Sequence, residues 1–189
     1  MPSDDRSIVP QLEVLRRELD QARMRAHAVA DAATPDLWAR RPARAGWSAA
    51  ECLGHLNLTS ERFVPLIADA LARARARGLT GAGPFRRDVA GWLLCRMLEP
   101  PYRVRVKTSP PFVPQGAEPV ERVLAAFDGW QSRLDALLVE ANGLPLDRVW
   151  IVSPFAERVR YNGYSSFCIV AAHQRRHLWQ AERALAGLG

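Results

Sequence analysis

Apolar side chains recur every three or four positions in four long stretches of the chain, at about 9–33, 48–77, 119–140 and 165–186. In the first stretch the repeat runs through Leu12, Leu15, Leu19, Ala22 and Ala26. This spacing gathers the apolar side chains on one side of an α-helix, because a helical turn takes 3.6 residues. The pattern therefore predicts four long amphipathic helices that pack together through their apolar sides.

The ends of these stretches carry helix start and stop signals. Ser48 and Glu51 have the spacing of a capping box, in which each side chain accepts a hydrogen bond from the other residue's backbone N–H. A Thr34-Pro35 pair closes the first stretch, and Asn142-Gly143 closes the third. Asn162-Gly163 comes just before the fourth stretch. These signals place the helix ends at the boundaries that the apolar pattern indicates.

About forty residues separate the second long stretch from the third, which exceeds a plain connection between packed helices. Residues 89–98 have the pattern of a short extra helix. Six of the 14 prolines lie between 100 and 119, so this segment is predicted to be a stiff, extended crossover and not a hairpin. Such a long crossover allows the second and third long helices to run parallel. Short extended pieces are expected at 150–152 and 158–161, but nothing demands a sheet, so the predicted class is all-α.

Composition narrows the class of protein. Hydrophobic residues make up 48% and charged residues 24%, close to the averages for globular domains, which excludes disordered, collagen-like and fibrous classes. No apolar run reaches the 18 residues that a membrane span needs, and the first residues lack the apolar segment of a signal peptide. We therefore expect a cytoplasmic protein without a membrane partner, with one domain over 1–189.

The net charge of +6 is a weak sign of nucleic-acid binding. Lys107 is the only lysine, and the arginines are spread over the whole chain. The densest run, Arg73, Arg75 and Arg77, turns around a helix and forms no single charged face. The three cysteines, Cys52, Cys95 and Cys168, include no C-x-x-C pair, and their odd number indicates reduced thiols.

The candidate chemistry lies in the histidines. His173 and His177 are four residues apart and share one side of the last predicted helix, about 6 Å apart at Cβ. His55 lies on the expected buried side of the helix at 48–77. A lone helical histidine or a pair at this spacing is more often an ordinary structural or surface feature. Three buried imidazoles each need a polar partner, however, and one divalent ion satisfies all of them.

We therefore predict a metal site made of His55, His173 and His177, with His27 as a structural or surface residue. Three nitrogen ligands leave a coordination position for water or substrate, as in catalytic sites. Imidazole suits zinc, nickel and iron alike, so the metal identity stays open. By helical spacing, Glu51 and Gln180 are candidates for orienting the ligand rings, although the capping box already employs Glu51.

Gln174 excludes one mechanism. Zinc proteases of the H-E-x-x-H type carry a glutamate directly after the first histidine as general base. Here that position is Gln174, whose amide cannot take up a proton. The two histidines therefore have the spacing of this protease motif, but the chain lacks the general base that the protease mechanism needs.

Two segments resemble the DinB-like superfamily, GWSAAECLGHL at 46–56 and AHQRRHLWQA at 172–181. The resemblance covers nearly the whole chain. It implies a four-helix bundle in up-down-down-up order, a divalent metal held by the three histidines, and a homodimer. Described enzymes of this superfamily include YfiT-like metal-dependent hydrolases and transferases that act on low-molecular-weight thiols such as bacillithiol or mycothiol. The insertion at about 78–117 departs from the family pattern and is expected to alter the rim of the site.

Three functions compete. The first is a metal-dependent transferase or hydrolase that acts on a small molecule, in which the metal activates a thiol or water. The second is a non-catalytic metal-binding protein, favoured if Cys52 or Glu51 closes the site as a fourth ligand. The third is a nucleic-acid-binding module, favoured by a contiguous arginine face. We place the first ahead, and we expect an apolar face of the helix at 9–33 or 119–140 to supply the homodimer contact.

Overall fold

The computed structural model describes residues 8–42, 46–101 and 108–187. Its four long helices are α1 (Pro10–Asp31), α3 (Ala49–Ala76), α5 (Val120–Ala141) and α6 (Gly163–Leu185). Each begins and ends within about two residues of a stretch that the apolar pattern indicates. The prediction of a mostly helical chain is therefore confirmed.

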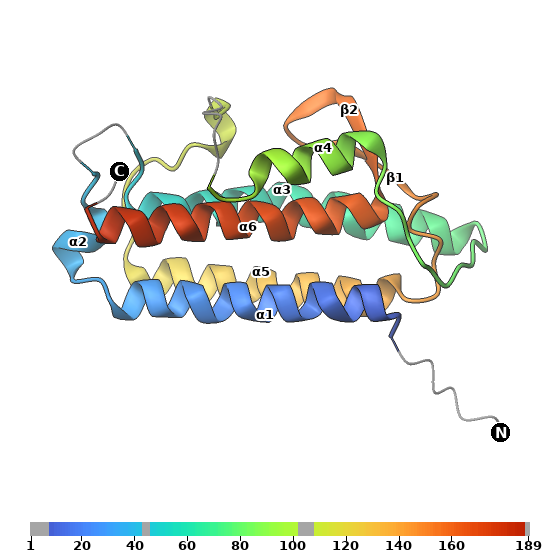
Figure 1. Cartoon of the computed structure of the whole chain (residues 1–189), viewed down its shortest axis with the longest axis horizontal. Helices are drawn as coiled ribbons and strands as arrows, with labels where there is room; N and C mark the ends of the chain where they lie inside the picture. Colours follow the sequence, from blue (N-terminus) through green and yellow to red (C-terminus); the bar gives the residue numbers. More distant parts are fainter. Residues whose placement is uncertain (1–7, 43–45, 102–107, 188–189) are drawn as a thin grey trace.

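The long helices pack in a closed ring of neighbours. α3 packs against both α5 and α6, and α1 packs against the same two helices. In Figure 1, α3 and α5 run in one direction, whereas α1 and α6 run in the opposite direction. Because α3 and α5 run the same way, the chain between them must return along the length of the molecule.

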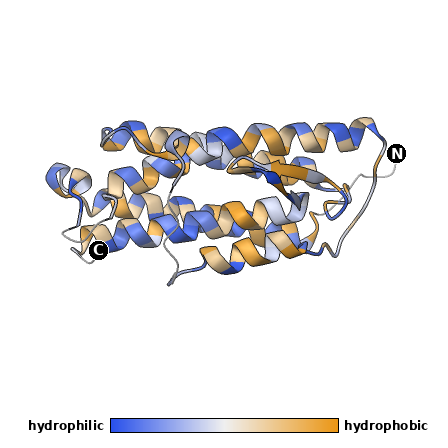
Figure 2. Ribbon diagram, turned by 90° about the horizontal axis from the view of Figure 1, so that it is seen from above, coloured by the Kyte–Doolittle hydropathy of each residue, from blue (hydrophilic) through white to orange (hydrophobic). Residues whose placement is uncertain are grey.

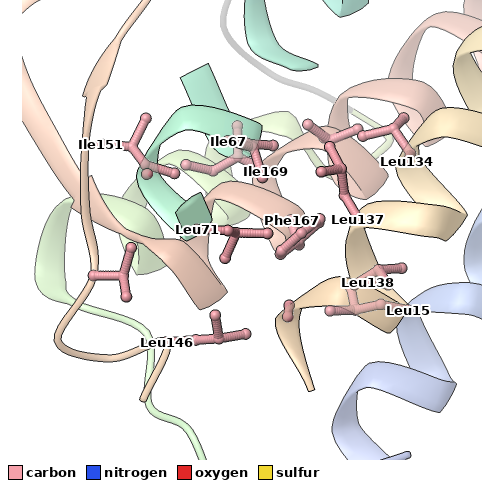
Figure 3. Packing of buried hydrophobic residues seen from close by; sticks show 14 of the residues in the cluster. Leu15, Ile67, Leu71, Leu134, Leu137, Leu138, Leu146, Ile151, Phe167 and Ile169 are labelled. Atoms are coloured by element: carbon pink, nitrogen blue, oxygen red, sulfur yellow. The ribbon is translucent and has the colours of Figure 1, made fainter. Parts of the chain in front are cut away.

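The core fills the space between these helices along their whole length. Figure 2 shows apolar and polar residues alternating along each long helix, as an amphipathic helix requires. One core cluster gathers side chains from several elements, among them Leu15, Ile67, Leu137 and Phe167 (Figure 3). Burying a side chain of this size stabilises the fold by roughly 1.5–3 kcal/mol, so the core dominates helix packing.

The start of α3 is fixed as the sequence indicates. The backbone N–H of Glu51 donates to Ser48 Oγ at 3.2 Å, and the N–H of Ser48 donates to Glu51 Oε2 at 2.9 Å. The capping box is therefore present in full. It holds the first turn of α3, and His55 follows one turn later.

The short helix α2 (Pro35–Ala39) was not predicted. Thr34 and Pro35 do follow the end of α1, but they also start this new helix. The Thr34 hydroxyl accepts a hydrogen bond from the N–H of Leu37, and proline is well suited to the first helical position. The signal for an end was therefore equally a signal for a start.

The predicted extra helix is present as α4 (Val89–Leu98), and it lies against α6. Asp88 caps it by accepting a hydrogen bond from the N–H of Gly91 at 3.0 Å. The same carboxylate accepts hydrogen bonds from Ser165 Oγ at 2.7 Å and from the N–H of Asn162 at 2.8 Å. These bonds to the charged form hold the pKa of Asp88 below its usual value against the opposing effect of burial. One carboxylate thus ties α4 to the start of α6.

A two-stranded antiparallel sheet corrects the expectation of a purely helical chain. Strands β1 (Trp150–Ser153) and β2 (Ala156–Asn162) occupy the two segments expected to be extended. Ile151 pairs with Tyr161, and both side chains are buried against the helices. The hairpin forms because this apolar pair finds a core to cover, which the local pattern does not reveal. Figure 1 shows α4 and the hairpin on the same side of the molecule.

Among the described residues of the proline-rich crossover there is one regular element, the 3₁₀ helix η1 (Pro110–Phe112). Phe112 is buried and packs against Phe155 of the hairpin loop, with 4.6 Å between ring centroids. Part of the predicted extended crossover, residues 102–107, lies outside the described residues. η1 contacts α3 and brings the crossover to the side of that helix.

Gly91 provides a test of the α4–α6 contact. A Cβ on Gly91 would overlap the Cβ and Oγ of Ser165. We expect Gly91→Ala to lower the free energy of unfolding by about 2 kcal/mol, since overpacking outweighs the better helix propensity of alanine. Gly129→Ala on α5 is the control, because its Cβ would meet nothing within 4 Å. The control should gain roughly 0.5–1 kcal/mol in urea denaturation. Equal stability of the two variants would contradict this close contact.

Candidate metal centre

α3 and α6 bring the three predicted histidines together. Each of His55, His173 and His177 offers a ligand atom, and these atoms all lie within 4.8 Å of one another. His55 and His177 are buried, and His173 is partly exposed. His27 lies elsewhere, as predicted: it is on α1, and its Nε2 is 2.9 Å from a carboxylate oxygen of Asp128.

The orientation of the His55 ring follows from its backbone partner. Its Nδ1 lies 2.7 Å from the carbonyl oxygen of Phe112, which only accepts hydrogen bonds. Nδ1 therefore carries the proton, and Nε2 presents a lone pair. That Nε2 lies 3.1 Å from Nε2 of His173. The two nitrogen atoms thus point at the same small region of space.

Phe112 is a functional residue that sequence reasoning missed. It acts through its backbone carbonyl, so its side chain type carries no signal of the role. The proline-rich run around it indicated only an extended crossover. The contact depends on where the crossover meets α3, and residue spacing alone does not reveal that position.

Trp47 closes one side of the histidine cluster. Its ring centroid lies 4.8 Å from that of His55 and 5.8 Å from that of His177, and its plane is nearly parallel to the His177 ring. Trp47 directly precedes Ser48, the residue that caps α3. The capping box therefore positions both a histidine and the aromatic ring beside it.

Burial makes the three imidazoles poor bases. Loss of solvation lowers the pKa of His55 to about 4, although its hydrogen bond to Phe112 opposes the shift. Burial also holds the pKa values of His173 and His177 well below the usual range, and the neighbouring histidines add to that effect. All three rings are therefore neutral at pH 7, the form in which histidine binds metals.

The cluster opens on a cavity of about 730 Å³. All three histidines line this cavity, together with Trp47. Residues of α4, residues on either side of η1 and residues of the hairpin complete its lining. Among the described residues, no fourth histidine, cysteine or carboxylate joins the three as a possible ligand. Cys52, considered as a fourth ligand, is fully buried among apolar side chains, and burial raises the pKa of its thiol.

These residues fit a divalent metal ion. Bonds of about 2.0–2.1 Å from a tetrahedral ion to two histidine nitrogens place those nitrogens about 3.3 Å apart. The 3.1 Å separation of the His55 and His173 nitrogens is close to that value. His55 would bind through Nε2, with its Nδ1 proton held by a backbone carbonyl, as metal-ligating histidines commonly are.

A comparison with models of protein families shows which family the chain belongs to. The family model of the DinB superfamily matches residues 18–181, a range that includes all three histidines. The chain belongs to the DinB superfamily. No curated protein and no solved structure matches it.

Two further residues of this DinB-superfamily chain were expected to orient the ligand rings. Gln180 lies one turn beyond His177, and its hydrogen bond to that ring opposes the fall in the pKa of His177. Glu51 is engaged elsewhere: its carboxylate binds the N–H of Ser48 and the guanidinium of Arg41. The His55 ring is held by the Phe112 carbonyl, so Phe112 occupies the role that was considered for Glu51.

Gln174 takes no part in the cluster of this DinB-superfamily chain. Its amide Nε2 donates to Gln131 Oε1 on α5 at 2.7 Å, and Gln131 Nε2 donates back at 3.2 Å. Both side chains are buried. Gln174 thus joins α6 to α5 while its two histidine neighbours face the cavity.

None of the described helices is long and apolar enough to span a membrane.

The buried histidines predict acid sensitivity of the metal-free protein. Unfolded histidine has a pKa of about 6.5, so between pH 6.5 and 4 the unfolded chain binds more protons than the folded chain. The free energy of unfolding therefore falls as the pH drops through this window. His55 alone contributes a loss of about 2 kcal/mol between pH 7 and 5.

Urea denaturation with a chelator present, at pH 7 and at pH 5, measures this loss. We expect His55→Gln to lose less stability on acidification than wild type, because the unfolded variant has one fewer site for a proton. Identical losses in wild type and His55→Gln would contradict the burial of a neutral His55.

Proposed function

We propose that this chain is a metal-dependent enzyme in which His55, His173 and His177 hold a divalent ion at the wall of a substrate cavity. One observation carries the proposal: three neutral nitrogen ligands converge beside a cavity of about 730 Å³, and no described residue completes the set. Structural metal sites are closed by four protein ligands, whereas catalytic sites keep one position open. The cavity is also of the size that small-molecule sites occupy.

The proposal includes the architecture around the site. The closed ring of contacts and the shared direction of α3 and α5 support a four-helix bundle in up-down-down-up order. It forms one domain over 1–189 with an insertion at about 78–117. The insertion carries α4 and η1, which cover the side of the bundle where the histidines lie.

The proposed reaction is of the thiol S-transferase or the hydrolase type. A divalent ion in this position supplies Lewis acidity and lowers the pKa of a thiol or water bound to it. The chain's own residues keep the imidazoles neutral by burial and fix the His55 ring through the Phe112 carbonyl. Apolar side chains of α4, with those of the hairpin, shield the cavity and favour an organic substrate, such as one that carries a low-molecular-weight thiol.

The alternative functions receive less support. A purely structural ion would join α3 to α6, but these helices already pack through their apolar sides. A nucleic-acid-binding face would need arginines that point to solvent together. Instead, Arg16, Arg25 and Arg133 are examples of described arginines that form ion pairs with carboxylates.

A homodimer is also part of the proposal, and it follows the family resemblance. Exposed apolar side chains gather on α4, where Val89, Trp92 and Leu93 are each at least half exposed. We therefore place the contact with a second copy on α4 instead of the helices at 9–33 and 119–140.

Light scattering at micromolar concentration tests the dimer. We expect twice the chain mass for wild type and a monomer for Trp92→Glu, because a charge cannot be buried unpaired in an apolar contact. Trp150→Glu, which alters an equally exposed tryptophan on β1, should remain a dimer. A monomeric wild type would contradict the proposal.

Metal content is the decisive measurement for the function. His177→Ala leaves two ligands, so we expect it to lose almost all of the metal that wild type retains through identical purification. α6 should persist, because alanine is the best helix former. The variant should also unfold at a lower temperature than metal-loaded wild type, since an ion that binds only the folded chain adds stability. His27→Ala is the matched control and should keep wild-type metal.

Elemental analysis of the three proteins gives metal per chain, and a thiol-conjugation screen of the loaded wild type then tests catalysis. Metal retained by His177→Ala would overturn the three-histidine site. A loaded wild type that transfers no thiol and hydrolyses no substrate would favour the non-catalytic alternative.

A further inference from the structure

A second cavity lies between α3, α5 and the proline-rich crossover. Its volume is about 660 Å³, and residues 110–118 of the crossover form one of its walls. Val113 lines both this cavity and the one at the histidines, whereas none of the three histidines lines the second cavity. The two cavities are therefore separate spaces that share one wall.

Most of the wall of this second cavity is apolar. The crossover contributes Pro110, Pro111 and Pro114, and α5 contributes Ala126 and Trp130. Proline rings fix a backbone angle and offer no N–H donor, so they present a stiff apolar surface. The volume and the lining fit the apolar part of a small organic ligand.

One hydrogen bond fixes the register of α3 against α5 beside this cavity. Nδ2 of Asn57 on α3 donates to the carbonyl oxygen of Val123 on α5 at 3.0 Å. Because the two helices run in the same direction, their next turns continue along the same cavity (Figure 1). Glu61 lies one turn beyond Asn57 on α3, and Trp130 lies in the next turns of α5. A carboxylate and an aromatic ring thus line the same end of the cavity.

The charged side chains of the lining leave an excess of one negative charge. Arg122 Nε lies 3.1 Å from Glu118 Oε2, so these two side chains offset each other. Glu61 is the remaining charged residue of the lining, and no described residue forms an ion pair with it. The cavity therefore favours a positively charged group at the end where Trp130 lies.

We propose that this cavity is a second binding site, which takes a small organic ammonium ion with an apolar body. The Glu61 carboxylate accepts charge-assisted hydrogen bonds from the ammonium group. The Trp130 ring attracts the same cation, because the face of an aromatic ring is electron-rich. The apolar body lies against Ala126 and the prolines of the crossover. This site uses none of the histidines, so the inference stands apart from the proposed function.

Calorimetry with 2-phenylethylammonium and with 2-phenylethanol, both on the metal-free protein at neutral pH and low salt, tests this site. The two probes share one apolar body and differ in the charge that Glu61 recognises. We expect wild type to bind the ammonium ion on the order of tenfold more tightly than the alcohol. Raised salt should reduce this preference, because Glu61 is exposed and its charge is screened.

Four variants locate the charged group and the apolar body of the probe. Glu61→Gln should bind both probes about equally, because the amide keeps the size of the side chain without its charge. Glu121→Gln makes the same change at an exposed position of α5 outside the lining and should keep the wild-type preference. Trp130→Leu removes the ring and should lose part of the preference. Ala126→Leu fills part of the cavity and should weaken the binding of both probes several-fold.

Melting temperatures establish that each variant is folded. Glu61 and Ala126 are exposed, so these two variants leave the core intact and test the site even if Trp130→Leu does not fold. Equal binding of both probes by wild type would overturn the assignment, and so would an unchanged preference in Glu61→Gln or unchanged affinities in Ala126→Leu. A protein that binds no metal would overturn the histidine site alone, because all of these measurements use metal-free protein.

Discussion

Three imidazoles within reach of one another, two of them buried and one partly exposed, must each stay neutral, because protonation of any one would place a charge in a poorly solvated space. Neutral rings keep lone pairs that need a partner, and the ligand atoms of the three rings all lie within 4.8 Å of one another. The packing of α3 on α6 thus creates a group of side chains that could hold a cation. The cavity in front of the cluster determines what else reaches these rings.

The elements outside the four long helices are attached to this site by polar contacts. Asp88 joins α4 to the start of α6, and Arg176 holds the last turn of α4. The Phe112 carbonyl joins the crossover to α3. Each contact uses a backbone group or a group already needed elsewhere in the fold. The insertion is thereby part of the site, although it contributes none of the three histidine side chains.

The sequence alone was sufficient for the parts that depend on local regularity. Helix period and the capping box located α3 and its His55, and the spacing of His173 and His177 located the rest of the cluster. Phe112 could not be found in this way, because its role belongs to a carbonyl carried in by tertiary structure. The hairpin needed the core that its buried Ile151 covers.

A ligand ring oriented by a backbone carbonyl has an evolutionary consequence. Every amino acid provides a carbonyl, so substitutions at position 112 can preserve the bond to His55 as long as the chain keeps its path. Insertions and deletions in the crossover are the changes that would move this acceptor. The bond to His55 therefore depends on loop length and course, whereas the Phe112 side chain is constrained separately by its packing against Phe155. A comparison of residue types alone would overlook a contact that orients one of the three histidine rings.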